Sequence, residues 1–295
     1  MNVSNDARPD DHRLYDLVLA ELTEPVASRV TTMAAAIAGL YPGSRAVLFY
    51  GSCLREAQLD GLMLDFYLIV ADYDRAFGRS WLVTANRLIP PNVFPYAHDG
   101  LAAKYAVLSE ADFAALNRAE ASTVSVWARF AQPTRLVWAA DEAASQAVVV
   151  AISQAAPTLL SLAGPMNRSP DPLDVWRTGF ALTYGCELRA ERHHRPGSIV
   201  DAEPQRYLRF AAAISVEPAT NAARRWGQLR RKGKGMTIVR LAKASLTFAG
   251  GIDYLAWKIN RHAGTQIIVK PWQRRWPLIG ALVLVPRLMR QGAIR

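Results

Sequence analysis

The sequence predicts an α+β protein: a mixed sheet flanked by helices, followed by a helical region and a basic amphipathic C-terminal region. Three observations lead to this prediction. Two short apolar runs at 46–50 and 62–70 have the length and composition of neighbouring buried strands. Apolar residues within 11–40 recur at helical intervals of three and four. Residues 221–295 contain sixteen Lys and Arg but a single acid, Asp253.

The first half of the chain alternates helices and strands. We expect two helices over 11–40, interrupted near Pro25, and then the strands of the two apolar runs. A helical pattern over 77–88 stops at two prolines, and strands follow at 93–96 and 102–108. Ser109 is the expected N-cap of a helix that continues to about residue 130, before a short strand at 135–138.

The second half is predicted to be helical. Its expected helical segments are 140–162, 172–191, 204–213 and 236–262. Changes in composition near 140 and 218 divide the chain into a sheet-containing domain at 1–140, a helical domain at 141–218 and a basic region at 219–295.

The basic region indicates a polyanionic partner, which is either nucleic acid or an anionic membrane. Its apolar stretch at 276–286 has eleven residues, about half the ~20 needed to span a bilayer. Tryptophans at one end and arginines at both ends are typical of a segment that lies in a membrane interface. An ordinary buried C-terminal helix is the alternative for this stretch alone. We therefore expect lipid contacts from Arg230, Arg231, Lys232, Arg274, Arg275 and Trp276.

The cysteine content and the N-terminus suggest a compartment. Two cysteines, Cys53 and Cys186, imply no disulfide framework and favour a reducing environment. Residues 1–16 are polar and acidic, without an apolar signal core. We expect a peripheral protein on the cytoplasmic face of a membrane.

The first apolar run, its Gly-Ser turn and the second apolar run with Asp65 inside it resemble the nucleotidyltransferase superfamily. That superfamily holds a nucleoside triphosphate and its metal with this arrangement. Gly51 and Ser52 leave the first strand where a backbone could approach a phosphate closely, and Arg55 or Lys104 could balance the phosphate charge.

The resemblance implies that Asp65 is a Mg²⁺ ligand, because carboxylates hold the metal in nucleotidyl transfer. The usual second acid, two residues on, is Tyr67 here, so Asp60 or Asp72 would supply the missing charge. A turn explains Asp60 equally well and helix capping explains Asp72, while a solvated edge position is the alternative for Lys104.

Further segments resemble one branch of the superfamily, the mitochondrial-type phosphatidate cytidylyltransferases (translocator assembly and maintenance proteins), of which this chain would be a bacterial relative. That branch also lacks the second acid. The similar segments are Phe49-Tyr-Gly-Ser-Cys, Met63-Leu-Asp-Phe, Leu101-Ala-Ala-Lys-Tyr-Ala-Val-Leu-Ser, Trp127 through Gln132-Pro133, and Ala244 through Lys258.

Family membership implies the reaction of CTP with phosphatidate to give CDP-diacylglycerol and pyrophosphate, with Mg²⁺, on an anionic membrane surface. Asp65 and Lys104 would be catalytic, and nucleic acid is not an expected partner. Two alternatives stay open: a nucleotidyltransferase acting on RNA or a soluble small molecule, and a non-catalytic adaptor bound to a membrane.

Overall fold

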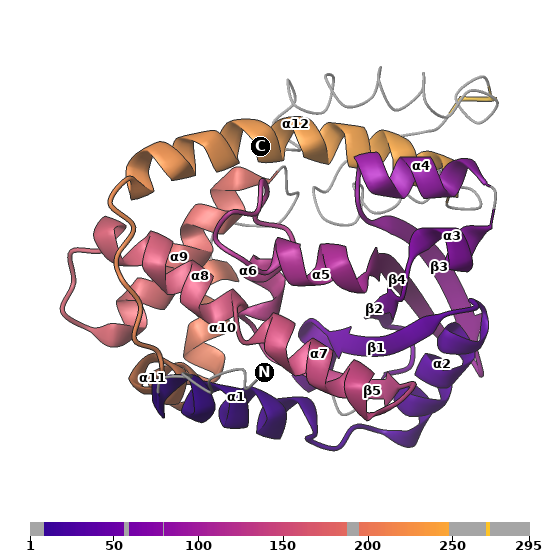
Figure 1. Ribbon diagram of the computed structural model, residues 1–295, viewed down its shortest axis with the longest axis horizontal. Coiled ribbons are helices and arrows are strands. Elements are labelled where there is room, and N and C mark those ends of the chain that lie inside the picture. Colours follow the sequence, from indigo (N-terminus) through magenta and orange to yellow (C-terminus); the bar gives the residue numbers. More distant parts are fainter. Residues whose placement is uncertain (1–8, 56–58, 79, 188–194, 248–269, 272–295) are drawn as a thin grey trace, which may run out of the picture.

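The computed structural model describes residues 9–55, 59–78, 80–187, 195–247 and 270–271 and has the predicted α+β architecture (Figure 1). A five-stranded sheet has the order β3-β4-β2-β1-β5, in which β2 pairs in parallel with β4 and the other neighbours are antiparallel. The sheet is therefore mixed, as expected. Its strands are β1 (Ser44–Tyr50), β2 (Met63–Val70), β3 (Asn92–His98), β4 (Leu101–Ser109) and β5 (Thr134–Ala139).

Helices flank this sheet and continue beyond it as a helical region (Figure 1). Those in the first half are α1 (Pro9–Leu22), α2 (Ser28–Gly39), α3 (Tyr73–Phe77), α4 (Trp81–Leu88), α5 (Glu110–Leu116) and α6 (Trp127–Phe130). Those in the second half are α7 (Glu142–Ile152), α8 (Ala155–Ala163), α9 (Pro172–Cys186), α10 (Arg195–Ala202), α11 (Pro204–Ala213) and α12 (Ala222–Thr247). Two short 3₁₀ helices are η1 (Ser52–Arg55) and η2 (Gly164–Met166).

The alternation of side chains along β2 separates two apolar cores. Leu64, Phe66 and Leu68 face the core that α2 covers. Tyr67 and Ile69 face the opposite core, which extends through α5–α9 to the first turns of α12. Asp65 and Tyr67 are two residues apart in β2, so the Asp65 side chain lies on the same face of the sheet as Tyr67.

The two helices predicted over 11–40 are confirmed as α1 and α2. Ser109 caps α5, as predicted, by accepting a hydrogen bond from the Asp112 backbone N–H at 3.1 Å. The predicted single helix from 109 to about 130 is wrong, because α5 ends at Leu116. Asn117 folds its Nδ2 back to the carbonyl of Phe113 at 2.8 Å, and a loop precedes α6. Gly78, at φ +59°, likewise separates α3 from α4 where one helix was expected.

The helix α12 begins earlier than the sequence suggested and includes the basic cluster at 224–234. It packs on α8, α9 and β3. Trp226 is buried, contacts Trp127 edge-on and donates its Nε1–H to the carbonyl of Leu162 at 2.9 Å. The basic region is thus anchored at its start by an apolar contact.

One segment of the described residues, Glu142–Met166, is long and apolar enough to cross a bilayer, with a mean hydropathy of 1.6. It consists of α7, α8 and η2 and packs against α5, α6, α9 and the sheet. Over half of its most apolar window, 56%, is buried inside the protein, so its place in the core accounts for its composition.

Two glycines of α12 test how tightly this helix docks. A Cβ at Gly233 would lie 2.3 Å from the carbonyl oxygen of Cys186, whereas a Cβ at Gly235 would meet nothing within 4 Å. We predict that Gly233→Ala lowers the free energy of unfolding by roughly 1–3 kcal/mol through overpacking against backbone. The matched control, Gly235→Ala, should raise it by up to about 1 kcal/mol through helix propensity. Urea denaturation measures both, and equal effects would contradict the packing of α12 on α9.

Candidate functional site

A row of polar side chains crosses the middle of the sheet. In the strand register, Asp65 of β2 pairs with Tyr50 of β1 on one side and with Lys104 of β4 on the other. The parallel pairing of β2 with β4 places the Lys104 side chain beside the carboxylate. Its Nζ lies 2.8 Å from Asp65 Oδ1.

This ion pair explains how a carboxylate is tolerated within an apolar strand. The side chains of Asp65 and Lys104 are 21% and 26% exposed, so each is mostly desolvated but still reachable by solvent. A carboxylate in such a position is costly without a cationic partner. Lys104 supplies this partner from an interior strand of the sheet, so it does not occupy the solvated edge position that the sequence left open.

Gly51 brings the chain close to the same carboxylate. It follows Tyr50 with φ +95°, a region that favours glycine, and a Cβ there would lie 3.2 Å from Asp65 Oδ2. The backbone then enters η1, which begins at the exposed Ser52 and ends at Arg55. The structure therefore brings Gly51, Asp65 and Lys104 together.

Arg129 on α6 joins this site although sequence reasoning gave it no role. Its Nη1 donates to the Tyr50 hydroxyl at 3.3 Å, and its guanidinium carbon lies 4.8 Å from the centre of the Tyr50 ring. Burial raises the pKa of Tyr50 well above its ordinary value, an effect that Arg129 opposes. The hydroxyl therefore stays protonated at neutral pH. The sequence feature that could have indicated Arg129 is its position within the segment Trp127–Pro133, one of the segments that resemble the cytidylyltransferases.

Two basic residues of α12 were also missed. Arg240 donates from Nε to the carbonyl of Pro90 at 2.9 Å and from Nη2 to Thr123 Oγ1 at 3.5 Å. Lys243 donates to the carbonyls of Ala85 and Ile89 at the end of α4. Burial, followed by repulsion from Arg240, lowers the pKa of Lys243 to about 7. The sequence showed these residues only as part of an amphipathic pattern.

The structure does not bring Asp60 or Asp72 to Asp65. Asp60 is exposed and pairs with Arg29 at 3.0 Å, on α2, which packs on the opposite face of the sheet. Asp72 caps α3 by accepting from the Arg75 N–H at 2.7 Å. β2 continues for five residues past Asp65 to Val70, roughly 16 Å at about 3.3 Å per residue, and Asp72 lies beyond its end. Asp60 is therefore a turn residue and Asp72 is a helix cap, the alternatives that the sequence left open for them.

The donor set determines whether Mg²⁺ fits. Within the described part of the chain, no group of three or more His, Cys, Asp and Glu side chains could hold a metal ion. Asp65 offers one carboxylate, and Lys104 contacts one of its oxygens. Mg²⁺ commonly binds through one or two carboxylates together with substrate phosphates and water. The site therefore fits a Mg²⁺ that arrives with a phosphate ligand and does not fit a preformed metal centre.

The predicted lipid-contacting residues divide into two groups. Arg230, Arg231 and Lys232 are exposed on α12, a helix with no acidic residue. Arg274, Arg275 and Trp276 lie outside the described residues.

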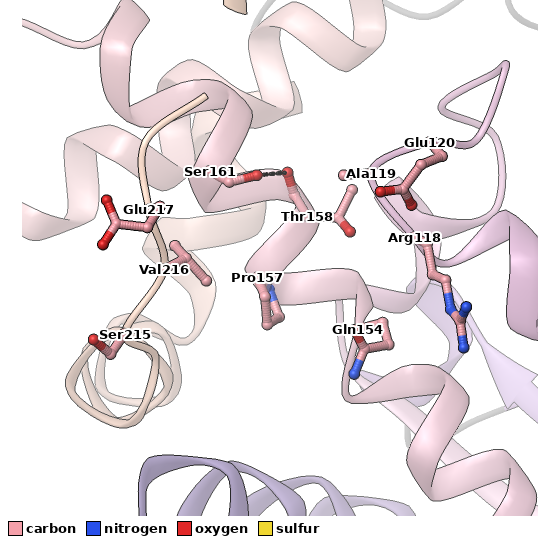
Figure 2. Close-up of a pocket in the computed structure, with 10 residues that line it drawn as sticks. All are labelled: Arg118, Ala119, Glu120, Gln154, Pro157, Thr158, Ser161, Ser215, Val216 and Glu217. Atoms are coloured by element: carbon pink, nitrogen blue, oxygen red, sulfur yellow. Dashed lines mark hydrogen bonds between the residues drawn. The ribbon is translucent and has the colours of Figure 1, made fainter. Parts of the chain in front are cut away.

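A separate open cavity of about 570 Å³ shares no residue with this site. Figure 2 shows its lining from α8, the loop after α5 and the segment at 215–217. Arg118, Glu120 and Glu217 bring both signs of charge to it, so its lining does not select an anion or a cation.

Comparisons with known proteins give a distant structural likeness. No protein-family model and no curated protein matches the chain. A solved structure described as a nucleotidyltransferase-like protein, from Exiguobacterium sibiricum 255-15, is 10% identical over 88% of this chain and 90% of its own, with a TM-score of 0.28. The resemblance to phosphatidate cytidylyltransferases therefore depends on the sequence motifs alone.

The ion pair predicts a non-additive double mutant. Lys104→Met leaves the Asp65 charge without its partner and should lower the free energy of unfolding by about 2 kcal/mol, below the 3–5 kcal/mol of fully buried pairs. Adding Asp65→Leu removes the unpaired charge and should restore part of this loss. Urea denaturation of the two single variants and the double variant measures the coupling. Single effects that sum to the double within about 0.5 kcal/mol would show that the two side chains do not interact.

Proposed function

We propose that the chain is a nucleotidyltransferase that transfers CMP from CTP to phosphatidate, giving CDP-diacylglycerol and pyrophosphate. The observation that carries the proposal is the convergence of Gly51, Asp65 and Lys104 at one position on the sheet. A turn that admits close backbone approach, a partly exposed carboxylate and a lysine are the groups that a metal-bound triphosphate requires.

Each group has a distinct role in this reaction. The backbone at Gly51 and Ser52 would donate to the triphosphate, with Arg55 at the end of η1 adding positive charge. Asp65 would hold Mg²⁺, which when bound neutralises phosphate charge and polarises the α-phosphorus. Lys104, released in part from Asp65, would contact phosphate oxygens.

The transfer itself is a substitution at the α-phosphorus. A phosphatidate oxygen forms the new bond to this phosphorus, and the bond to the bridging oxygen of the β-phosphate breaks. Pyrophosphate leaves with that oxygen and its electron pair. The phosphate of the lipid is already anionic at neutral pH, so the reaction needs no strong general base from the protein.

The exposed basic side chains of α12 support a membrane-bound acceptor. Arg230, Arg231 and Lys232 would contact anionic lipid, together with Arg274, Arg275 and Trp276, at the cytoplasmic face of the membrane. Such a surface would hold the phosphatidate near the site.

One observation favours a second function, that of a non-catalytic adaptor. Of the three carboxylates expected to bind Mg²⁺, Asp65 alone lies beside Gly51 and Lys104, and Lys104 already neutralises its charge. A nucleotidyltransferase-like protein that has lost its chemistry could retain such a pair for stability alone.

A release assay distinguishes these functions. We predict pyrophosphate release with CTP, more than with ATP, GTP or UTP, and only when phosphatidate vesicles are present. Asp65→Asn should reduce the rate by at least roughly 100-fold, because it removes the negative charge that would hold Mg²⁺. Asp74→Asn, an equal charge change at an exposed ion pair, is the matched control and should leave the rate unchanged.

The outcomes separate the candidates. No release with any nucleotide, with or without vesicles, would favour the adaptor. Release without vesicles, or release stimulated by RNA, would indicate a different acceptor. Full activity in Asp65→Asn would overturn the assignment of the site.

A further inference from the structure

Two arginines on the Tyr67 side of the sheet form no ion pair with a carboxylate of the described residues. Arg129 and Arg240 are both partly buried. Within the residues that the structure describes, no carboxylate forms an ion pair with either of them; Arg129 contacts Tyr50, and Arg240 contacts the Pro90 carbonyl and Thr123. The nearest acids act on them at longer range.

The contacts of the two arginines show how they lie relative to each other and to the polar row of Tyr50, Asp65 and Lys104. Arg129 lies against Tyr50, the β1 neighbour of Asp65, and its guanidinium carbon is 6.0 Å from the centre of the Tyr67 ring. Arg240 reaches Thr123, in the loop that leads into α6. Figure 1 shows α12 crossing the molecule from the helical region to α4. This helix therefore brings Arg240 to the segment that carries Arg129.

The electrostatics at this position are unbalanced. Burial lowers the pKa of Arg240, as does repulsion from Arg129, while attraction by Glu187 opposes both. For Arg129, burial opposes the charged form, but Tyr50, Tyr67, Glu187 and Asp65 outweigh it. Glu187 acts on both guanidinium groups and Asp65 acts on that of Arg129, but Asp65 is already paired with Lys104. Desolvating a cation without a matching anion is costly.

We propose that Arg129 and Arg240 form a binding site for a phosphate group on the face of the sheet that carries Tyr67 and Asp65. This inference rests on the proposed function, because it assigns the residues that would receive one of the two phosphate-bearing substrates. A guanidinium group has five N–H donors in a planar fork that matches phosphate oxygens. The hydrogen bonds described above engage one nitrogen of Arg129 and two of Arg240, so each retains N–H groups for a ligand.

Two buried hydroxyl groups can complete the site. Thr123 and Ser125 are 4% and 9% exposed, and their hydroxyl oxygens lie 3.2 Å apart. Because Thr123 already contacts Arg240, an anion between the two arginines would have neutral donors beside it.

The bound phosphate could belong to the nucleotide, through its β- and γ-phosphates, or to the lipid headgroup. Both present the same anionic oxygens. Calorimetric titrations with inorganic pyrophosphate and with soluble dihexanoyl phosphatidate distinguish the two sources, because neither probe contains a base and neither undergoes transfer.

We expect Arg129→Gln and Arg240→Gln each to weaken binding of the same probe by at least about tenfold, the range for a hydrogen bond to a charged group. Loss of pyrophosphate binding would assign the nucleotide, and loss of dihexanoyl phosphatidate binding would assign the lipid. Arg240→Lys keeps the charge and should lie between native and Arg240→Gln. Arg224→Gln, an exposed change on the same helix, should leave both dissociation constants unchanged.

Several results would overturn the site: a native protein that binds neither probe, or dissociation constants for both probes that are unchanged in Arg129→Gln and Arg240→Gln. Should Arg240→Gln unfold, Arg129→Gln on α6 and the charge-retaining Arg240→Lys decide the question. The outcome is separable from that of the proposed function. Probe binding that depends on both arginines supports the phosphate site even if no pyrophosphate is released. If pyrophosphate is released but probe binding does not depend on the two arginines, the phosphate site is rejected and the proposed function is not.

Discussion

The parallel pairing of β2 with β4 is the constraint on which the candidate site depends. It places Lys104 directly beside Asp65 in the middle of an otherwise apolar sheet, with Nζ 2.8 Å from Oδ1. Without this neighbour, the strand could not hold a partly buried carboxylate at acceptable cost. The same register places Tyr50 on the other side of Asp65 and brings the turn at Gly51 against its second oxygen. One strand pairing thus both stabilises the sheet and assembles the polar groups.

The second constraint is the position of α12. Its first turns are fixed by the burial of Trp226, and Gly233 allows close approach to the end of α9. Farther along, Arg240 and Lys243 bind carbonyl groups at and beyond the end of α4. A helix held at both ends places Arg240 and Lys243 over the core and leaves Arg230, Arg231 and Lys232 exposed to solvent. This division explains how one basic segment can serve two purposes in the proposed function.

Local pattern predicted the fold well, and long-range contacts limited the prediction of the site. The strands around Asp65 and the cap at Ser109 followed from apolar alternation and from side-chain capping chemistry. The end of α5 was missed because the hydrogen bond from Asn117 to Phe113, which precedes the loop, leaves no signal in apolar spacing. The pairing of Asp65 with Lys104 depends on sheet order, which sequence does not display. For the same reason, Asp60 and Asp72 were grouped with Asp65 by proximity in the chain, although turns and caps place them elsewhere.

The central claim is that the convergence of Gly51, Asp65 and Lys104 holds a nucleoside triphosphate with its metal. Calorimetric titration of the native protein with CTP, with and without Mg²⁺, tests this claim most directly. The account predicts binding that requires Mg²⁺ and is lost in Gly51→Val, whose side chain would enter the space beside Asp65 Oδ2. Absence of binding at millimolar CTP, or equal binding by Gly51→Val, would contradict it.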